Sequence, residues 1–290
     1  MREAVARFVP DGATVALGTC LEPAIPFAAG HELIRQGRRD LTLVGPISDA
    51  LFDQLIGAGC VAKVIAAWVG NVSEGLGHCY RRAAEKGEPR RIEIHDHSNF
   101  SISLALWAAA WNSPFLPTTT LLGSDILKTN PDLVLGDGHV RVKPVRPDVA
   151  IVHVQRADAE GRAHFWGPYG ITEEAGLAAG RVILSCEELV GEEVTLSDPN
   201  RVLFPETKVV AVVHEPGGCH PAPIQGHWSR DHAAHREYGE RSRSAEGYQE
   251  WLRERVLGVR DRAEYMTRVD ADAIRIKRHL LSAPVDYGDV

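Results

Sequence analysis

Apolar and polar residues alternate along the chain in a pattern that predicts repeated strand–helix pairs. Short apolar runs rich in Val, Leu and Ile are each followed by a stretch with the apolar spacing of a helix. Four such pairs come first: strand 14–18 with helix 27–35, 41–44 with 50–56, 64–68 with 78–86, and 92–94 with 101–111. Further strands are expected at 150–154, 182–185 and 209–213. Because these last three strands are nearly continuous apolar runs, the pattern indicates an α/β fold with a mainly parallel sheet and helices on both faces.

The composition changes after residue 215, where His, Gly and Pro become frequent before a helical pattern at 244–256. We therefore expect an α/β core over 1–215 and a C-terminal helical extension over 216–290 that packs on the core or on a partner. Three histidines at the start of the extension are interpreted as a solvated helix face: His227, His232 and His235. The polar, proline-containing segment 128–147 is expected to form a long excursion or lid.

Charge and cysteine content limit the class of protein. The chain has 32 Lys and Arg against 39 Asp and Glu, a formal charge of -7, which argues against a nucleic-acid partner. The longest apolar stretch, 102–111, is too short to cross a membrane, and the N-terminus is charged where a signal peptide is apolar. The five cysteines are odd in number and lack a C-x-x-C pair. These features predict a cytoplasmic protein with no membrane partner, no disulfide framework and no Cys-rich zinc site.

The first candidate site residues follow the first predicted strand. Ligands of parallel sheets bind outside the carboxyl ends of the strands, which here lead into turns at 18–26, 45–50, 70–77 and 95–99. Gly18 allows either a close approach of the backbone to a ligand or a purely structural tight turn, and both readings stay open. Thr19 follows it. Cys20 is a nucleophile if a nearby histidine makes it a thiolate, although a small residue packed in a turn is the simpler reading.

The segment from His95 to Asn99 follows the fourth predicted strand. Period-two geometry places His95 and His97 on one side of the strand. No third ligand is near, so no metal is expected. The two imidazoles suit a substrate-facing or acid/base role, or simply a polar loop end satisfied by its neighbours. Ser98 and Asn99 precede an apolar helix, and Asn99 is either its N-cap or an amide offered to a ligand, where it would stabilise an oxyanion.

Several segments together resemble the A (α) subunit of the family I CoA-transferases, of the glutaconate CoA-transferase type. Their order and spacing hold across nearly the whole chain. The matching core segments are Asp11–Gly18, Asp40–Gly45, Leu55–Gly59, Pro114–Pro117, Leu122–Asp125 and Val154–Gly161. The extension adds His220-Pro221, Trp251-Leu252 and Ala263-Glu-Tyr265.

The resemblance implies ping-pong transfer of CoA between an acyl-CoA and a carboxylic acid. In this family a glutamate of a separate B subunit carries the acyl group and then CoA as a thioester, so a B-type partner is expected. CoA is then a co-substrate, and no permanently bound cofactor is expected. Asn99 matches an amide that polarises the acyl carbonyl, and Gly18 falls in the glycine-rich first turn. Thr19, Cys20, His95, His97 and Ser98 are expected to line the substrate.

Two alternatives remain beside the transferase. The steroid ring-cleaving hydrolases, a sister branch, carry a catalytic glutamate at the position that aligns with Asn99, and an amide cannot act as a general base. A hydrolase that uses His95 or His97 as its base therefore stays the second reading, and a non-catalytic acyl-CoA-binding subunit the third. The segment Pro117-Thr-Thr-Thr120 lacks an arginine common in relatives, which argues against glutaconate itself as the substrate.

Overall fold

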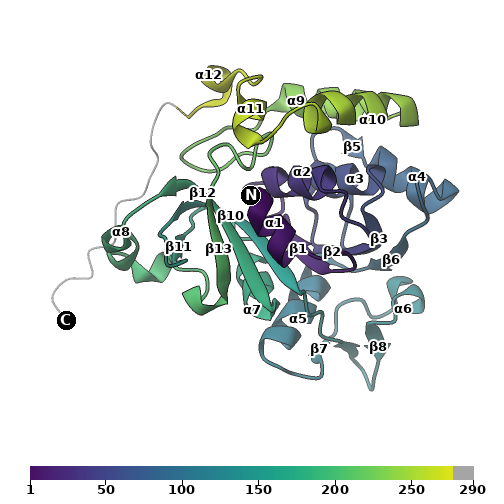
Figure 1. The fold of residues 1–290 in the computed structure, drawn as a ribbon. Helices are drawn as coiled ribbons and strands as arrows, with labels where there is room; N and C mark the ends of the chain where they lie inside the picture. The colour runs from purple at the N-terminus through teal and green to yellow at the C-terminus, as the bar shows by residue number, and fades with distance from the viewer. Residues whose placement is uncertain (277–290) are drawn as a thin grey trace.

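The computed structural model describes residues 1–276 and has a parallel sheet at its centre (Figure 1). Seven parallel strands lie in the order β13-β12-β10-β1-β2-β3-β6, and β11 (Ala163–His164) pairs antiparallel with β10. Their bounds are β1 Thr14–Leu17, β2 Leu41–Gly45, β3 Val61–Ala66, β6 Glu93–Asp96, β10 Val149–Ala157, β12 Arg181–Leu189 and β13 Val209–His214. The predicted parallel sheet is confirmed, and each predicted strand overlaps an observed one.

Helices cover both faces of this sheet (Figure 1). On one face lie α1 (Arg2–Phe8), α2 (Phe27–Arg35), α3 (Asp49–Gly57) and α4 (His78–Lys86), and on the other α5 (Asn99–Ala110) and α7 (Thr172–Ala178). Two buried apolar clusters result, one per face. Along β1, Val15 and Leu17 belong to the first and Ala16 to the second. This is why Val15, Ala16 and Leu17 form a continuous apolar run.

The segment 128–147 is an excursion from the central sheet, as predicted, but a folded one, and its role as a lid stays a prediction. It supplies most of a three-stranded antiparallel sheet formed by β7 (Leu116–Thr118), β9 (Val140–Val142) and β8 (Leu133–Leu135), preceded by α6 (Ile126–Thr129). Leu133, Val140 and Val142 are buried with the side chains of α5. The glycine-rich stretch is the hairpin turn between β8 and β9, because the Gly136 N–H donates to His139 O at 2.8 Å.

The C-terminal extension packs outside α2 and α3 (Figure 1). It contains α9 (His232–Arg241), α10 (Ala245–Leu252), a π-helical turn (Arg253–Leu257), α11 (Arg262–Met266) and α12 (Ala271–Ile274). Trp251, Leu252 and Val256 are buried, and Tyr248 Oη donates to Gln54 O of α3 at 2.6 Å. The extension therefore shares the core of the α2–α3 face.

The remaining described elements are short. They are the hairpin β4 (Gly70–Asn71) and β5 (Gly75–Leu76), helix α8 (Glu192–Leu196), and 3-10 turns at Pro199–Arg201 and Glu206–Lys208. Within residues 1–276, none of the helices combines the length and apolar character needed to span a bilayer.

Candidate active site

The strand order reverses between β1 and β10, which marks the point where ligands of such sheets bind. From β1 the chain proceeds outward through β2, β3 and β6, then returns to place β10 beside β1 and continues to β12 and β13. A crevice forms outside the carboxyl ends of two strands whose connections leave in opposite directions. The turn after β1, which begins Gly18-Thr19-Cys20, lies at this point.

Three contacts attach this turn to the start of α7. The hydroxyls of Thr19 and Thr172 share a hydrogen bond at 2.8 Å, and Cys20 Sγ lies 2.9 Å from the same Thr172 Oγ1. The Ile171 N–H donates to Thr19 O at 2.8 Å. Thr19 and Cys20 are therefore fixed in place by α7, and their predicted contact with substrate stays a prediction.

Gly18 is required by the fold itself. Its φ is +68°, and a Cβ there would lie 2.6 Å from Ser48 Cβ, in the turn after β2. Ser48 Oγ also donates to Leu17 O at 3.0 Å. The structural reading of this glycine is thus supported, because any larger residue would push the two turns apart.

Cys20 does not have the surroundings of a nucleophile. The side chain is buried, and this burial raises the pKa of its thiol to about 12. Hydrogen bonds from Thr172 and Thr19 oppose the shift without cancelling it. The thiol is protonated at neutral pH and fills a tight turn.

The first turn of α5 supplies the second part of the site. Ser98 is the N-cap, since Ser98 Oγ accepts from the Ser101 N–H at 3.0 Å and Ser101 Oγ accepts from the Ser98 N–H at 2.9 Å. The N-cap reading of Asn99 is therefore wrong: Asn99 is the first helical residue, and it is exposed. Its amide makes no hydrogen bond within residues 1–276 and is free to meet a ligand beside the positive end of α5.

Helix α5 packs against α7, the helix that holds the Gly18–Cys20 turn. Ser103, one turn after Asn99 on the same face of α5, donates to Glu174 of α7 at 2.9 Å. Glu174 is in the first turn of α7, and Thr172, which holds Thr19 and Cys20, begins that helix. The first turns of α5 and α7 thus lie side by side at the carboxyl edge of the sheet.

Both ring nitrogens of His95 have partners within this chain. Its Nδ1 lies 2.6 Å from Asp132 Oδ2, and its Nε2 lies 2.7 Å from Glu93 Oε1, so each ring nitrogen has a carboxylate partner. His95 and Glu93 share one side of β6, as the period-two pattern requires. A role of His95 in substrate selection stays a prediction, and the polar-loop reading accounts for its contacts.

His97 differs from His95 in having one ring nitrogen without a partner. Its Nδ1 lies 3.0 Å from Ser101 Oγ, whereas its buried Nε2 has no hydrogen-bond partner among the described residues. Burial lowers the pKa of His97 to about 4, with the charge of Asp132 acting in the opposite direction. The imidazole is therefore neutral at physiological pH.

Acidification is expected to destabilise the fold through His97. An imidazole that titrates near 6.5 in the unfolded chain and near 4 in the folded one binds its proton first in the unfolded state. The contribution of His97 to stability is therefore fully present above pH 6.5 and decreases by about 1.4 kcal/mol per pH unit between pH 6.5 and 4. Urea unfolding across this range should show a shallower loss for His97→Gln than for the parent. His232→Gln, an exposed control, should keep the parent slope, and equal slopes for all three would contradict the assignment.

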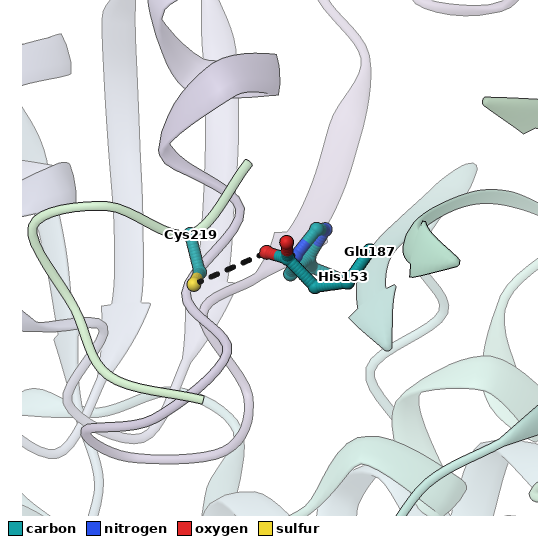
Figure 2. A group of neighbouring side chains, drawn as sticks. All are labelled: His153, Glu187 and Cys219. Carbon is teal, nitrogen blue, oxygen red and sulfur yellow. Dashed lines mark hydrogen bonds and ion pairs between the residues drawn. The ribbon is translucent and has the colours of Figure 1, made fainter. Parts of the chain in front are cut away.

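A second polar cluster is buried beside the sheet, formed by His153 on β10, Glu187 on β12 and Cys219 in the loop after β13 (Figure 2). The three offer ligand atoms within 4.8 Å of one another, and all are buried. Glu187 Oε1 lies 2.9 Å from His153 Nε2, and Glu187 Oε2 accepts from Trp228 Nε1 at 2.8 Å and from the Gly217 N–H at 2.9 Å.

The chemistry of this cluster suits a hydrogen-bonded carboxylate better than a metal. Burial alone would raise the pKa of Glu187, but the hydrogen bonds from His153, Gly217 and Trp228 hold it below its usual value. Burial raises the pKa of the Cys219 thiol well above normal, and His153 Nδ1 is taken by Ser185 Oγ at 2.9 Å. A metal would have to displace these contacts and deprotonate the thiol. The expectation of no metal therefore stays our prediction.

The chain belongs to the coenzyme A transferase family, whose model matches residues 1–215. It is 39% identical over 276 residues to the A subunit of 3-oxoadipate CoA-transferase from Pseudomonas knackmussii, covering 93% of this chain and 96% of that one. It is 30% identical to the A subunit of glutaconate CoA-transferase from Acidaminococcus fermentans, covering 93% and 91%. The crystal structure of that glutaconate enzyme superposes with a TM-score of 0.88, covering 95% of this chain and 94% of that one.

A more distant relative belongs to the hydrolase branch. The cholesterol ring-cleaving hydrolase IpdA subunit of Mycobacterium tuberculosis is 28% identical over 264 residues, covering 84% of this chain and 87% of that one. The resemblance to A-type CoA-transferase subunits and the expected fold are thus confirmed.

Proposed function

We propose that this chain is the A-type component of a CoA-transferase whose B-type partner supplies the reacting glutamate. One observation carries the proposal: the carboxyl edge of the sheet presents an exposed, unpartnered amide at Asn99 beside a helix N-terminus, while the thiol of the same edge, Cys20, is buried and protonated. The Asn99 amide can polarise a carbonyl group, but the protonated Cys20 thiol cannot attack one. The 3-oxoadipate and glutaconate relatives are both named as A subunits, which supports a two-chain enzyme.

The chemistry would proceed by acyl exchange on the partner's glutamate. The carboxylate attacks the thioester carbonyl of the acyl-CoA, and the oxyanion that forms takes a hydrogen bond from the Asn99 amide. CoA leaves as a thiolate and an acyl–glutamyl anhydride remains. The thiolate then attacks the glutamyl carbonyl, which releases the first carboxylic acid and leaves CoA as an enzyme thioester. An incoming carboxylate reverses both steps, so CoA enters and leaves as a co-substrate and no resident cofactor takes part.

The acyl group is proposed from the 39% identical relative, which is named for 3-oxoadipate. The residue after Asn99 is apolar and reaches solvent, since Phe100 is 53% exposed. This surface suits the carbon chain of an acyl group or a partner side chain. A 3-oxo dicarboxylic acid of six carbons is the first acceptor to test because of that relative's name, and its second carboxylate would need a cationic partner outside residues 117–120.

Reconstitution tests the proposal directly. The chain is co-expressed with a B-type subunit from the same organism, and transfer of CoA from an acyl-CoA to 3-oxoadipate and related acids is measured. We expect transfer by the complex and a rate for the isolated chain at least about 1,000-fold lower, because the attacking group is absent. Full activity of the isolated chain would contradict the division of labour. A complex that binds acyl-CoA but transfers nothing would favour the non-catalytic reading.

The hydrolase reading is favoured by one feature, the neutral and unpartnered Nε2 of His97. A hydrolase releases free CoA without an acceptor acid, whereas a transferase needs one. We expect release without an acceptor to be at least about 20-fold slower than transfer with one. If release is equally fast in both cases and falls in His97→Gln, the protein is a hydrolase with His97 as its base.

A further inference from the structure

A single guanidinium of the C-terminal extension contacts the turns that follow three neighbouring strands. Arg230 Nη2 donates to Asp49 Oδ2 at 2.7 Å, where the turn after β2 leads into α3, and Arg230 Nε donates to Ser73 Oγ at 2.7 Å, in the β4–β5 hairpin after β3. Its buried Nη1 has no hydrogen-bond partner among the described residues and makes only a long ion pair, 4.0 Å, with Glu22 Oε2 in the turn after β1. The planar fork of arginine suits such simultaneous contacts, which the single ammonium of lysine cannot reproduce.

Asp49 is the residue through which Arg230 acts. Its carboxylate is completely buried, and Oδ1 accepts from the Val72 N–H at 3.0 Å while Oδ2 accepts from Arg230. His235 Nε2 lies 3.5 Å from Oδ2. The interpretation of three histidines as a solvated helix face holds only for His232, because His227 lies before α9 with its side chain 12% exposed and α9 buries His235. A buried carboxylate without its cation would be strongly destabilised, so Asp49 stays where Arg230 holds it.

Asp49 in turn fixes the wall of the candidate active site. Ser48 and Asp49 both have left-handed φ values, 59° and 45°, which non-glycine residues adopt only where their surroundings impose it. Ser48 Oγ donates to Leu17 O at 3.0 Å, and Ser48 packs against Gly18 with no room for a side chain there. Contacts therefore run without a gap from Arg230 through Asp49 and Ser48 to the Gly18 turn.

We propose that Arg230 is a positioning residue that holds the Gly18–Cys20 turn in the geometry the active site requires. It acts through Asp49 and Ser48 and does not touch the substrate. This makes the C-terminal extension a structural component of the site. The effect on turnover rests on the proposed function, whereas the effect on the turn itself does not.

Three variants of this chain, each in complex with the B-type partner, test the proposal. Arg230→Met keeps the length of the side chain and removes all donors, and Arg230→Lys keeps the charge and loses the fork. The double variant Asp49→Asn with Arg230→Met removes the buried charge together with its partner. Arg236→Met is the matched control, because Arg236 lies on the same extension, 63% exposed, with its nearest carboxylate, Glu74, at 3.9 Å.

Two readouts are needed, kcat against KM and hydrogen–deuterium exchange of the amides of residues 18–22. We expect Arg230→Met to lower kcat by at least about tenfold with KM within about threefold, and to accelerate exchange in 18–22. Arg230→Lys should lie between this variant and the parent, and Arg236→Met should match the parent. If Arg230 positions the turn, the double variant regains stability but keeps the low kcat.

Parent-like kcat in the double variant would show that Arg230 only balances a charge, and would overturn the proposal. Unchanged exchange in 18–22 for both Arg230→Met and Arg230→Lys would overturn it as well. If Arg230→Met does not fold, the Lys variant and the double variant decide. Hydrogen–deuterium exchange is measured without substrate and so does not depend on the proposed function. If the parent complex transfers no CoA, the proposed function is wrong, and the exchange rates of residues 18–22 alone decide whether Arg230 positions the turn.

Discussion

Asn99→Ala in the complex with the B-type partner is expected to lower kcat by about 100-fold, equivalent to about 2.7 kcal/mol of lost transition-state stabilisation. The amide is exposed, has no partner within the described chain and stands at the first position of α5, so its N–H groups are available to an oxyanion. Because the oxyanion forms only during reaction, KM should change little. Steady-state kinetics of the reconstituted complex measures both constants.

Two further variants of α5 separate an oxyanion role from a structural one. Asn99→Asp keeps the shape but cannot donate, and should be as slow as Asn99→Ala. Asn112→Gly removes an exposed residue at the opposite end of α5, where φ is 52° and glycine is accepted, and should keep the parent rate. A rate for Asn99→Ala within about threefold of the parent would remove Asn99 from the mechanism.

Glu187→Ala is expected to lower the free energy of unfolding by about 3–5 kcal/mol, because it removes one partner of a buried, charged hydrogen-bond network. The change would leave His153, the Gly217 N–H and Trp228 Nε1 without their shared acceptor in the interior of the protein. Trp228 and Gly217 belong to the loop that joins the sheet to the extension, so this loop should loosen first. The free energy of unfolding in urea measures the loss.

The neighbouring glutamate is the control for this effect. Glu188, on the same strand, pairs with Arg156 at 2.8 Å and keeps a third of its side chain exposed, so Glu188→Ala should cost less than about 1 kcal/mol. Equal losses for the two variants would contradict the central place of the Glu187 network. Stabilisation of the parent by added zinc that is absent in Glu187→Ala would indicate a metal site instead.

Strand positions were predictable because each apolar run faces a buried cluster on both sides. Val15, Ala16 and Leu17 show the reason: adjacent residues enter different cores, and the run reads as continuous. The hairpin within 128–147 was missed because β8 and β9 are three residues each and are bounded by glycine and proline. In so short a stretch, the glycine and proline residues predict a loop more strongly than the alternating Val140 and Val142 predict a strand.

The site was predictable in part. The turns that carry Gly18 and Asn99 follow from the strand-end rule, but the roles of Ser98 and Asn99 at the start of α5 do not, because either residue is a good N-cap. Arg230 and Asp49 are 181 residues apart, and no local pattern connects them. For Glu187 a signal existed, since His153 and Gln155 interrupt an apolar strand that is buried on both faces. Polar residues in such a strand need partners, and those partners lie on another strand.

The position of the CoA thioester tests the central claim most directly. The two-chain complex is incubated with acyl-CoA alone, and the covalent adduct is located by mass spectrometry after mild digestion. We predict CoA on a glutamate of the B-type partner and none on this chain. Glu22→Gln, which removes an exposed carboxylate from the turn after β1, should leave the adduct unchanged. A CoA thioester on Glu22, or on any other residue of this chain, would contradict the account.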